Sequence, residues 1–539
     1  MSAERVNAAA EVRPGPWSPF RHPVFRALWI AGLASNVGTW MQNVGAAWLM
    51  TSLAPQPLFV ALVQAASNLP FFLLAIPAGA LADVVDRRRL ALFALAWLAL
   101  AAALLAALAW AGGVGPPALL GLTFAIGVGS ALLSPGFAAL VPELVPREEI
   151  EPAVSLNGIS MNLARAVGPA LGGLLVATAG AAATFALNAL SFVAVMAVLA
   201  RWRRPTPERS LPPEELFGAM RAGLRYVRHS PALRTVLLRT GSFVLPASAV
   251  WALLPVYARN ELALGPSGYG VLLGFFGVGA VAGGIALPRA RRALGPERLA
   301  TGAALAFAGS HLVLGLTQSL APIAVALFVA GAAWLALLSM LNAAAQVTIP
   351  AWVRARALAI QMLVLFGGLA LGSTAWGAVA GVVGVPRAFE WAALAIALGR
   401  LVTWRQSLPL DVGLDLTPAP RWPDPELARS FEPDRGPALV TVEYQVDPSD
   451  AERFARSMRL MGEIRLRDGA LRWGLWVDAA QPGRYLESFV VGSWLEHLRQ
   501  HERITSADRE VQALALAFHR GPSPPRVTHF VHERIPEDA

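Results

Sequence analysis

Hydrophobic residues occur in long blocks between short polar segments, from residue 27 to about residue 404. A block of about 20 largely apolar residues is long enough to cross a bilayer as a helix. The pattern predicts twelve such spans, at 27–52, 57–82, 89–111, 116–141, 153–178, 181–200, 236–258, 268–288, 298–317, 320–346, 356–381 and 386–404. We therefore expect an all-α membrane bundle in two six-helix halves, residues 21–200 and 236–405, joined by a charged central loop, 201–235.

The pattern changes after residue 405. Residues 406–436 are rich in Pro and Asp, which is typical of a linker. Residues 437–539 alternate between strand-like and helix-like segments in the order β-α-β-β-α-β, which predicts a small soluble α+β domain with a ferredoxin-like fold. Residues 1–20 form a polar N-terminal tail without an apolar core segment, so no cleavable signal peptide is expected.

Arginine marks alternate loops. Clusters such as Arg87–Arg89, Arg201–Arg204 and Arg289–Arg292 lie between spans on one predicted side, whereas the opposite loops carry only Arg259 and Arg387. This asymmetry predicts that the arginine-rich loops and both termini are cytoplasmic. It also explains the net charge of +9 without nucleic acid as a partner. Segment 216–234 has helical apolar spacing with interleaved arginine, which favours a helix on the bilayer surface over a solvated connector.

Composition agrees with a multi-pass membrane protein. The mean hydropathy is +0.52 and only 15% of residues are charged, against about 25% in soluble proteins. The chain has no cysteine, which excludes disulfides, thiolate metal sites and a cysteine nucleophile. It has no GxxxxGK[ST] loop either, so direct drive by ATP is not expected.

Arg165 lies within an otherwise apolar predicted span. A guanidinium at the bilayer centre costs roughly 2.5–3.5 kcal/mol on insertion scales, so such a residue indicates function. Helical spacing places Gly168 and Gly172 on its face, next to Pro169. The combination predicts a transporter helix that lines a polar path.

The segment GALADVVDRRRL, residues 79–90, resembles the signature loop of the major facilitator superfamily. Gly79, Asp83, Arg87 and Arg88 match that pattern, while Asp86 replaces its second glycine. The resemblance implies a conformational latch that closes the cytoplasmic side. Asp83 would then face the N-terminus of span 356–381, where helix dipole and arginine charges favour a carboxylate.

Several segments are similar to the bacterial efflux branch that includes enterobactin and macrolide exporters. Among them, Gly168, Pro169, Gly172 and Gly173 resemble the antiporter motif of drug exporters, which implies proton antiport. Thr123 stands where many of those exporters carry an arginine, and no Asp or Glu lies deep in any span. Proton coupling is therefore implied by the resemblance alone.

Polar and aromatic residues within the spans are the candidates for a substrate cavity. They are Asn36, Trp40, Gln42, Asn43, Gln64, Asn68, Asn157, Asn162, Asn342, Gln346, Gln361 and Trp376. We expect about half of them to face the cavity and the rest to join helices. His311 could titrate, although packing is the commoner role of a lone histidine.

The C-terminal segment resembles the antibiotic-biosynthesis-monooxygenase-like domains. Its His497 and His501 share one helix face, but no third ligand is evident, so solvated surface is favoured and neither metal nor cofactor is expected. Trp473, Trp476 and Trp494 either line a pocket or fill the core. Dimerisation or regulation is the favoured role of this domain, and no enzymatic activity is expected.

The leading hypothesis is a secondary active efflux transporter that exports a small organic molecule, siderophore or drug-like, by alternating access with protons as the driving ion. One alternative is a transporter fused to a catalytic monooxygenase-like domain. The other is an importer on the same fold.

Overall fold

The computed structural model describes residues 15–140, 143–202, 216–410, 415–417, 419, 432 and 434–533. These residues form two compact units. Unit 1 comprises Met1–Pro213, Arg239–Met340 and Met362–Trp404, and unit 2 comprises Glu214–Leu238, Leu341–Gln361 and Arg405–Ala539. Most of the predicted N-terminal tail and linker lie outside the described residues.

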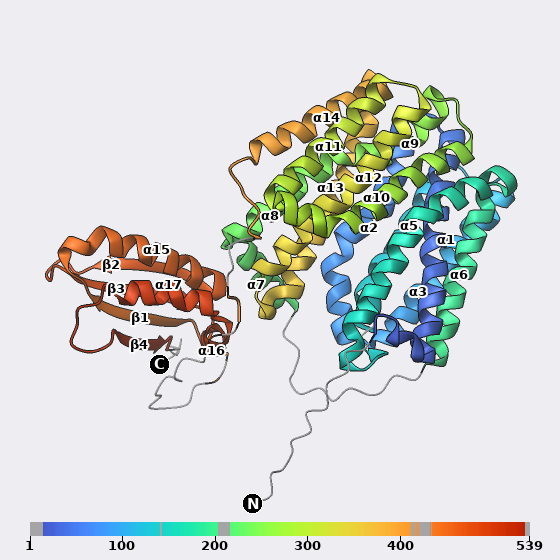
Figure 1. Cartoon of the computed structure of the whole chain (residues 1–539). Helices are drawn as coiled ribbons and strands as arrows, with labels where there is room; N and C mark the ends of the chain where they lie inside the picture. The colour runs from blue at the N-terminus through green and yellow to red at the C-terminus, as the bar shows by residue number, and fades with distance from the viewer. Residues whose placement is uncertain are drawn as a thin grey trace, which may run out of the picture. The chain divides into compact units, whose positions relative to one another are not determined.

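Helices occupy all twelve predicted span positions (Figure 1). The first half consists of α1 (Pro23–Leu53), α2 (Pro57–Val84), α3 (Arg87–Trp110), α4 (Pro116–Leu140), α5 (Ile150–Ala179) and α6 (Ala181–Arg201). The second half consists of α8 (Pro231–Ala247), α9 (Ala249–Val256), α10 (Pro266–Leu294), α11 (Pro296–Leu316), α12 (Leu320–Thr348), α13 (Arg354–Val383) and α14 (Val385–Val402). The seventh predicted span is α8 and α9 together, extended by the π-helical turn η4 (Tyr257–Glu261).

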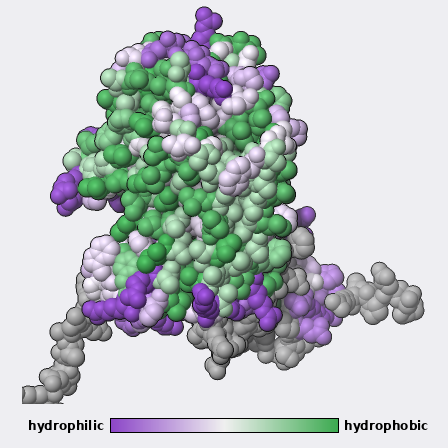
Figure 2. All heavy atoms as spheres, turned by 90° about the vertical axis from the view of Figure 1, so that its right-hand side faces the viewer, coloured by the Kyte–Doolittle hydropathy of each residue, from purple (hydrophilic) through white to green (hydrophobic). Residues whose placement is uncertain are grey.

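Ten helical segments of the described chain are long and apolar enough to cross a membrane. The helices α1 and α14 are not among them, and α14 carries three charged residues in its 18 positions. Apolar side chains cover the middle of the visible face in Figure 2, and polar ones gather towards its two ends. This distribution is what a lipid-facing surface requires.

Small residues set the closest helix crossings in unit 1. A Cβ on Gly279 of α10 would overlap the carbonyl oxygen of Phe328 on α12, and a Cβ on Gly331 of α12 would overlap that of Phe276. Only glycine fits where backbones approach so closely.

The soluble part of unit 2 has the predicted ferredoxin-like order. Its elements are β1 (Ala438–Gln445), α15 (Ala451–Asp468), β2 (Ala470–Val477), β3 (Arg484–Val491), α16 (Trp494–Arg503), α17 (Ser506–Leu516) and β4 (Arg526–Val531). The strands form one antiparallel sheet in the order β2-β3-β1-β4. The single helix that the β-α-β-β-α-β order predicts before the last strand is divided into α16 and α17, because Thr505 and Asp508 form a capping box that starts α17.

The core of this domain lies between the sheet and its helices. Phe454, Met458 and Met461 of α15 pack against Val442 and Tyr444 of β1, and all five are buried. Strand β1 alternates buried and partly exposed residues, so one face of the sheet meets the helices.

The helix α7 (Leu216–Arg228) also belongs to unit 2. Its Ala222 and Tyr226 are buried, and the Tyr226 ring lies edge-on to Trp352 with centroids 5.9 Å apart. Protein therefore covers part of the apolar face that the sequence assigned to lipid.

Candidate functional site

Arg165 of α5 lies at one end of a row of aromatic rings that runs from α1 in the first half to α9 and α10 in the second. The guanidinium carbon is 6.0 Å from the centroid of the Trp40 ring on α1. Trp40 in turn lies 6.2 Å from Trp251 on α9, and Trp251 packs edge-on against Phe276 of α10. The structure thus brings a cation and a row of aromatic rings together where the first half meets the second.

Within the described part of the chain, Arg165 makes no hydrogen bond or ion pair, and its one charge contact is the Trp40 ring. Cation–π attraction of this kind contributes about 0.5–2 kcal/mol, less than a paired carboxylate would. A half-buried guanidinium with so little compensation attracts an anionic group. The geometry therefore suits an anionic, aromatic ligand.

The glycines after Arg165 hold α5 against two neighbours. A Cβ on Gly168 would lie 2.6 Å from the Cβ of Trp40, and one on Gly172 would lie 2.8 Å from the Cα of Met41, both on α1. A Cβ on Gly173 would lie 2.5 Å from the carbonyl oxygen of Pro266 at the start of α10. The first two glycines thus pack within the first half, and Gly173 packs across the two halves.

Pro169 takes part in the same crossing through its backbone. Its carbonyl oxygen would lie 2.6 Å from a Cβ on Gly270 of α10. Further along, a Cβ on Gly277 would lie 2.5 Å from the Cα of Ala166, next to Arg165. The helix pair α5–α10 is therefore in backbone contact from Gly173 to Ala166.

Several cavity candidates instead join helices. Gln42 is buried and accepts a hydrogen bond from Asn188 of α6 at 2.7 Å. Gln361 is buried and donates to Asn342 at 2.9 Å, and the Trp376 indole donates to the carbonyl oxygen of Leu245 at 3.2 Å. These bonds join helices inside the bundle, although the Gln361 amide oxygen itself is buried without a hydrogen-bond partner among the described residues.

The remaining candidates differ in exposure. Asn68 is buried and donates to the Gln64 carbonyl oxygen at 2.7 Å, and Asn36 donates to Ser160 of α5 at 3.3 Å. The partly or fully exposed ones are Asn36, Trp40, Asn43, Gln64, Asn157, Asn162, Asn342 and Gln346. Of these, Asn36 and Trp40 lie one turn apart on α1, on the side of Arg165.

Arg259 of η4 joins the halves at the arginine-poor end, which we define as the end of the bundle holding the α1–α2 and α9–α10 connections. Its guanidinium donates to the hydroxyls of Thr51 (2.9 Å) and Ser52 (2.5 Å) at the end of α1. It also lies 5.6 Å from the Trp48 ring centroid. The sequence marked Arg259 only as an exception to the charge pattern, and the structure makes it a bond between halves.

At the opposite, arginine-rich end, the signature arginines make contacts within the first half. Arg87 pairs with Glu143 at 3.1 Å, and Arg88 donates to the last carbonyl oxygens of α6, those of Leu199 and Ala200. Gly79 and Asp83 lie in the last two turns of α2. The arginines thus brace the loops around the predicted latch.

Sequence reasoning missed an ion triad in the second half. Arg239 of α8 and Arg400 of α14 both bind Glu297, at 2.7 and 2.8 Å, in the first turn of α11. The sequence feature that could have revealed the triad is the position of Arg239 and Arg400 at the edges of apolar spans, where a charged side chain needs a partner. The triad ties α8, α11 and α14 together.

His311 of α11 is fully buried. Its Nδ1 lies 3.0 Å from the carbonyl oxygen of Phe307, and its ring packs against the rings of Phe307 and Phe389. These contacts are those of a packing residue.

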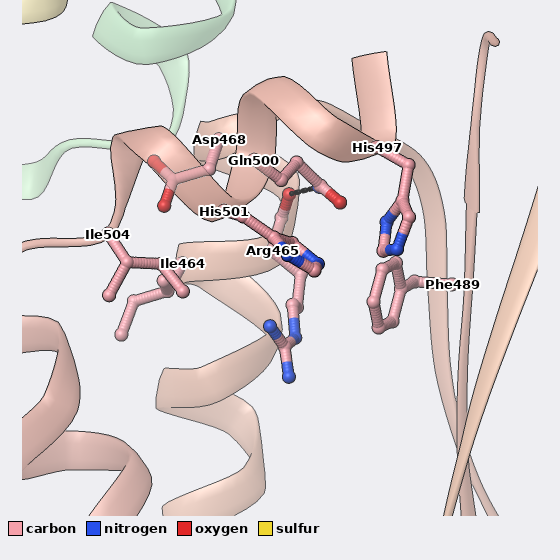
Figure 3. Close-up of a pocket in the computed structure, with 8 residues that line it drawn as sticks. All are labelled: Ile464, Arg465, Asp468, Phe489, His497, Gln500, His501 and Ile504. Atoms are coloured by element: carbon pink, nitrogen blue, oxygen red, sulfur yellow. Dashed lines mark hydrogen bonds between the residues drawn. The ribbon is translucent and has the colours of Figure 1, made fainter. Parts of the chain in front are cut away.

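The soluble domain has a small cavity between α15, β3 and α16 (Figure 3). Its lining residues are Ile464, Arg465, Asp468, Phe489, His497, Gln500, His501 and Ile504. His497 and His501 are buried, so the prediction that they form solvated surface is wrong: α16 turns this face towards the sheet. Burial, together with His501 and His529, lowers the pKa of His497 to about 3.

His529 of β4 completes a cluster of imidazoles, with its ring 4.8 Å from that of His497. Within the described residues, no three His, Cys, Asp or Glu side chains are arranged to hold a metal ion. The tryptophans do not line the cavity. Trp494 is buried in the core, Trp473 donates to the buried Glu487, and Trp476 is exposed.

Comparison with known proteins places these features in context. The model of the transmembrane secretion effector family matches residues 14–537. The multidrug efflux pump Tap of Mycolicibacterium fortuitum is 27% identical over 386 residues, which are 69% of this chain and 92% of that protein. The enterobactin exporter EntS of Salmonella typhi is 27% identical over 327 residues, 60% of this chain and 75% of that protein.

Solved structures share the fold. A bacterial homologue of the iron transporter ferroportin, in an inward-facing state, has a TM-score of 0.54 at 17% identity and covers 71% of this chain and 98% of its own. A POT family transporter in complex with 5-aminolevulinic acid has a TM-score of 0.61 at 13% identity, covering 74% of this chain and 98% of its own. The bundle therefore has the fold of the major facilitator superfamily.

Proposed function

The chain belongs to the transmembrane secretion effector family of the major facilitator superfamily, and on that premise we propose that it exports a small organic molecule by alternating access. The relatives named above are a multidrug efflux pump and a siderophore exporter. A further relative is the staphyloferrin A transporter of Staphylococcus aureus, 23% identical over 263 residues. The proposed cargo is therefore siderophore-like or drug-like, and the proposed role is siderophore export or drug resistance.

One observation carries the choice of substrate class. Arg165 has no carboxylate partner among the described residues and lies beside the Trp40 ring. That ring in turn lies next to the ring of Trp251 in the other half. An anionic aromatic molecule, such as a catecholate, would pair with the guanidinium and stack on the indoles. A site made from both halves is also one that alternating access can expose to either side.

We propose a bacterial inner-membrane location, with the arginine-rich end and both termini in the cytoplasm. Arg259 and the Gly173–Gly270 contact then close the outer side of the bundle. The structure would accordingly represent an inward-facing state. Gly79, Asp83, Arg87 and Arg88 would form the cytoplasmic latch once the halves rock.

Protons are the proposed driving ion. The support is the sequence of α5 around Gly168 and Pro169, which resembles the antiporter motif, and the chain has no phosphate-binding loop for ATP. In such an exchange, the negative charge of the bound cargo would compensate the positive charge of Arg165.

The soluble domain is proposed to pair with a second copy of itself. The sheet face away from the helices exposes Trp476 and Phe530, with Leu486 and Val490 partly exposed between them. Burying such an apolar face in a dimer is favourable. A catalytic role is the second candidate, because the cavity of Figure 3 holds the buried His497 beside Arg465.

Ligand-induced proton movement in inverted membrane vesicles tests export. The wild type is compared with Arg165→Ala, and Arg298→Ala serves as a control because Arg298 is exposed at the arginine-rich end. The panel holds catecholate siderophores, macrolides and cationic dyes. We expect catecholates to collapse the gradient with the wild type and the control only. A response that Arg165→Ala leaves unchanged would remove Arg165 from the site, and no response to any compound would contradict proton-coupled export of these classes.

A further inference from the structure

A charged surface of the soluble domain contacts the chain's own central loop within unit 2. Glu496 of α16 lies between two arginines. Arg503 donates to it at 2.7 and 3.3 Å, and Arg225 of α7 donates to it at 2.9 Å. The three side chains are 19%, 6% and 19% exposed, in the order Glu496, Arg503, Arg225.

Aromatic residues extend this contact. The Arg503 guanidinium lies 4.7 Å from the ring centroid of Trp352, in the turn between α12 and α13. Tyr226 of α7 packs on the same indole and donates its hydroxyl to the carbonyl oxygen of Thr348 at 2.7 Å. The Arg467 guanidinium of α15 lies 5.8 Å from the centroid of the Tyr226 ring.

The charges at this contact are balanced. Burial alone would raise the pKa of Glu496, but hydrogen bonds and charges from Arg503 and Arg225 outweigh it and hold the pKa below its usual value. Arg467 is neutralised by Asp468 and Asp508. Removing Arg225 would leave Glu496 paired with Arg503 inside the soluble domain, but it would break the ion pair that joins α16 to α7.

The two segments that the domain contacts lead into the second half of the bundle. α7 continues into α8, and Thr348–Trp352 continues into α13. Gly223 of α7 lies against Arg356 in the first turn of α13: a Cβ on it would be 3.0 Å from the Cβ of Arg356. This first turn is the proposed receiver of the Asp83 latch.

We propose that the soluble domain regulates transport by docking, through Glu496 and Arg503, on α7 and on the turn between α12 and α13. The docked domain holds the start of α13 together with α7. Docking therefore favours the state in which the arginine-poor end is closed, and undocking favours its opening. The inference rests on the proposed alternating access, and its readouts need no transported substrate.

Two spin-label pairs in the full-length protein test this inference, because the chain has no cysteine of its own. Leu224→Cys on α7 with Leu514→Cys on α17 reports docking, and both side chains are exposed. Gln56→Cys with Leu320→Cys reports the distance between halves at the arginine-poor end. Arg225→Glu is the test variant because it opposes Glu496 while leaving the soluble domain's own Glu496–Arg503 pair intact.

The control is Arg221→Glu, the same substitution one turn earlier on α7 at an exposed position. We expect Arg225→Glu to lower the docked-to-undocked ratio at least ten-fold and to raise the open fraction at the arginine-poor end. Arg221→Glu should change neither. Trp352→Ala, which keeps every charge, should shift both distances in the same direction and provides the test if Arg225→Glu fails to fold.

Undocking without a change at the arginine-poor end would overturn regulation by docking. Intact docking in both Arg225→Glu and Trp352→Ala would overturn the surface itself. If the label pairs respond as expected while the vesicles show no transport, the proposed export fails and the docking inference stands.

Discussion

Replacing Arg259 with Gln should open the arginine-poor end of the bundle. Arg259 is half-buried and makes the hydrogen bonds to Thr51 and Ser52 and the contact with the Trp48 ring described above. Glutamine keeps polarity and most of the length but removes the charge. The closed state loses these interactions, while a state with separated halves has none of them to lose.

The magnitude follows from the contacts. A hydrogen bond from a charged donor contributes about 1.5–3 kcal/mol when buried, and an exposed cation–π contact about 0.5–1 kcal/mol. Partial exposure and the bonds that Gln can still form reduce the total to about 2 kcal/mol. Since 1.4 kcal/mol is a factor of ten, the closed-to-open ratio should fall roughly 30-fold.

Distance measurement between spin labels at Gln56→Cys and Leu320→Cys provides the assay, with Arg387→Gln as the control. Arg387 is the other arginine of this end, and it is exposed. We expect a second, longer distance to appear with Arg259→Gln and not with Arg387→Gln. Identical distributions in the two variants would refute the assignment of Arg259 as the bond that closes this end.

Three further predictions concern the crossing of α5 with α10 and the soluble domain. Gly173→Leu should abolish transport while the protein still inserts, because the new Cβ would lie 2.5 Å from the carbonyl oxygen of Pro266. Gly158→Leu, where a Cβ meets no atom within 4 Å, should be tolerated, and transport in vesicles measures both variants. Glu487→Gln should destabilise the soluble domain by about 3–5 kcal/mol because it breaks a buried ion pair, and Glu443→Gln by less than 1 kcal/mol, as read from limited proteolysis of the full chain. Because the pKa of His497 is lowered in the folded domain, the unfolded chain protonates this imidazole at a higher pH than the folded domain does. The free energy of unfolding should therefore be highest above about pH 6.5 and fall as the pH drops towards 3. Hydrogen exchange referenced to intrinsic rates should show this loss, and His497→Phe should reduce it.

The fold could be predicted because hydropathy and turn residues act locally. Proline begins α2, α10 and α11, and glycines with positive φ precede α6 and α14, at Gly180 and Gly384. Each signal lies within a few residues of the boundary that it sets. The ferredoxin-like order of the soluble domain followed from alternation in the same way.

The site could be predicted only in part, because its contacts join distant positions. Gln42 looked like a cavity residue, but its partner Asn188 is 146 positions away. Arg259 was conspicuous by its charge, yet its role depends on Thr51, 208 positions earlier. Residue type indicated polarity in each case, and only the packing of helices decides which polar groups meet.

The backbone contact between α5 and α10 makes the bundle a lever with its fulcrum near one end. From Gly173 to the first residue, Ile150, α5 runs roughly 35 Å at 1.5 Å per residue. A rotation of about 10° around that contact would displace the far end by roughly 6 Å, about the thickness of an aromatic ring with its van der Waals contacts. A pivot made of main chain cannot be compressed or slid by changing a rotamer, so nearly all of the stroke is delivered at the arginine-rich end.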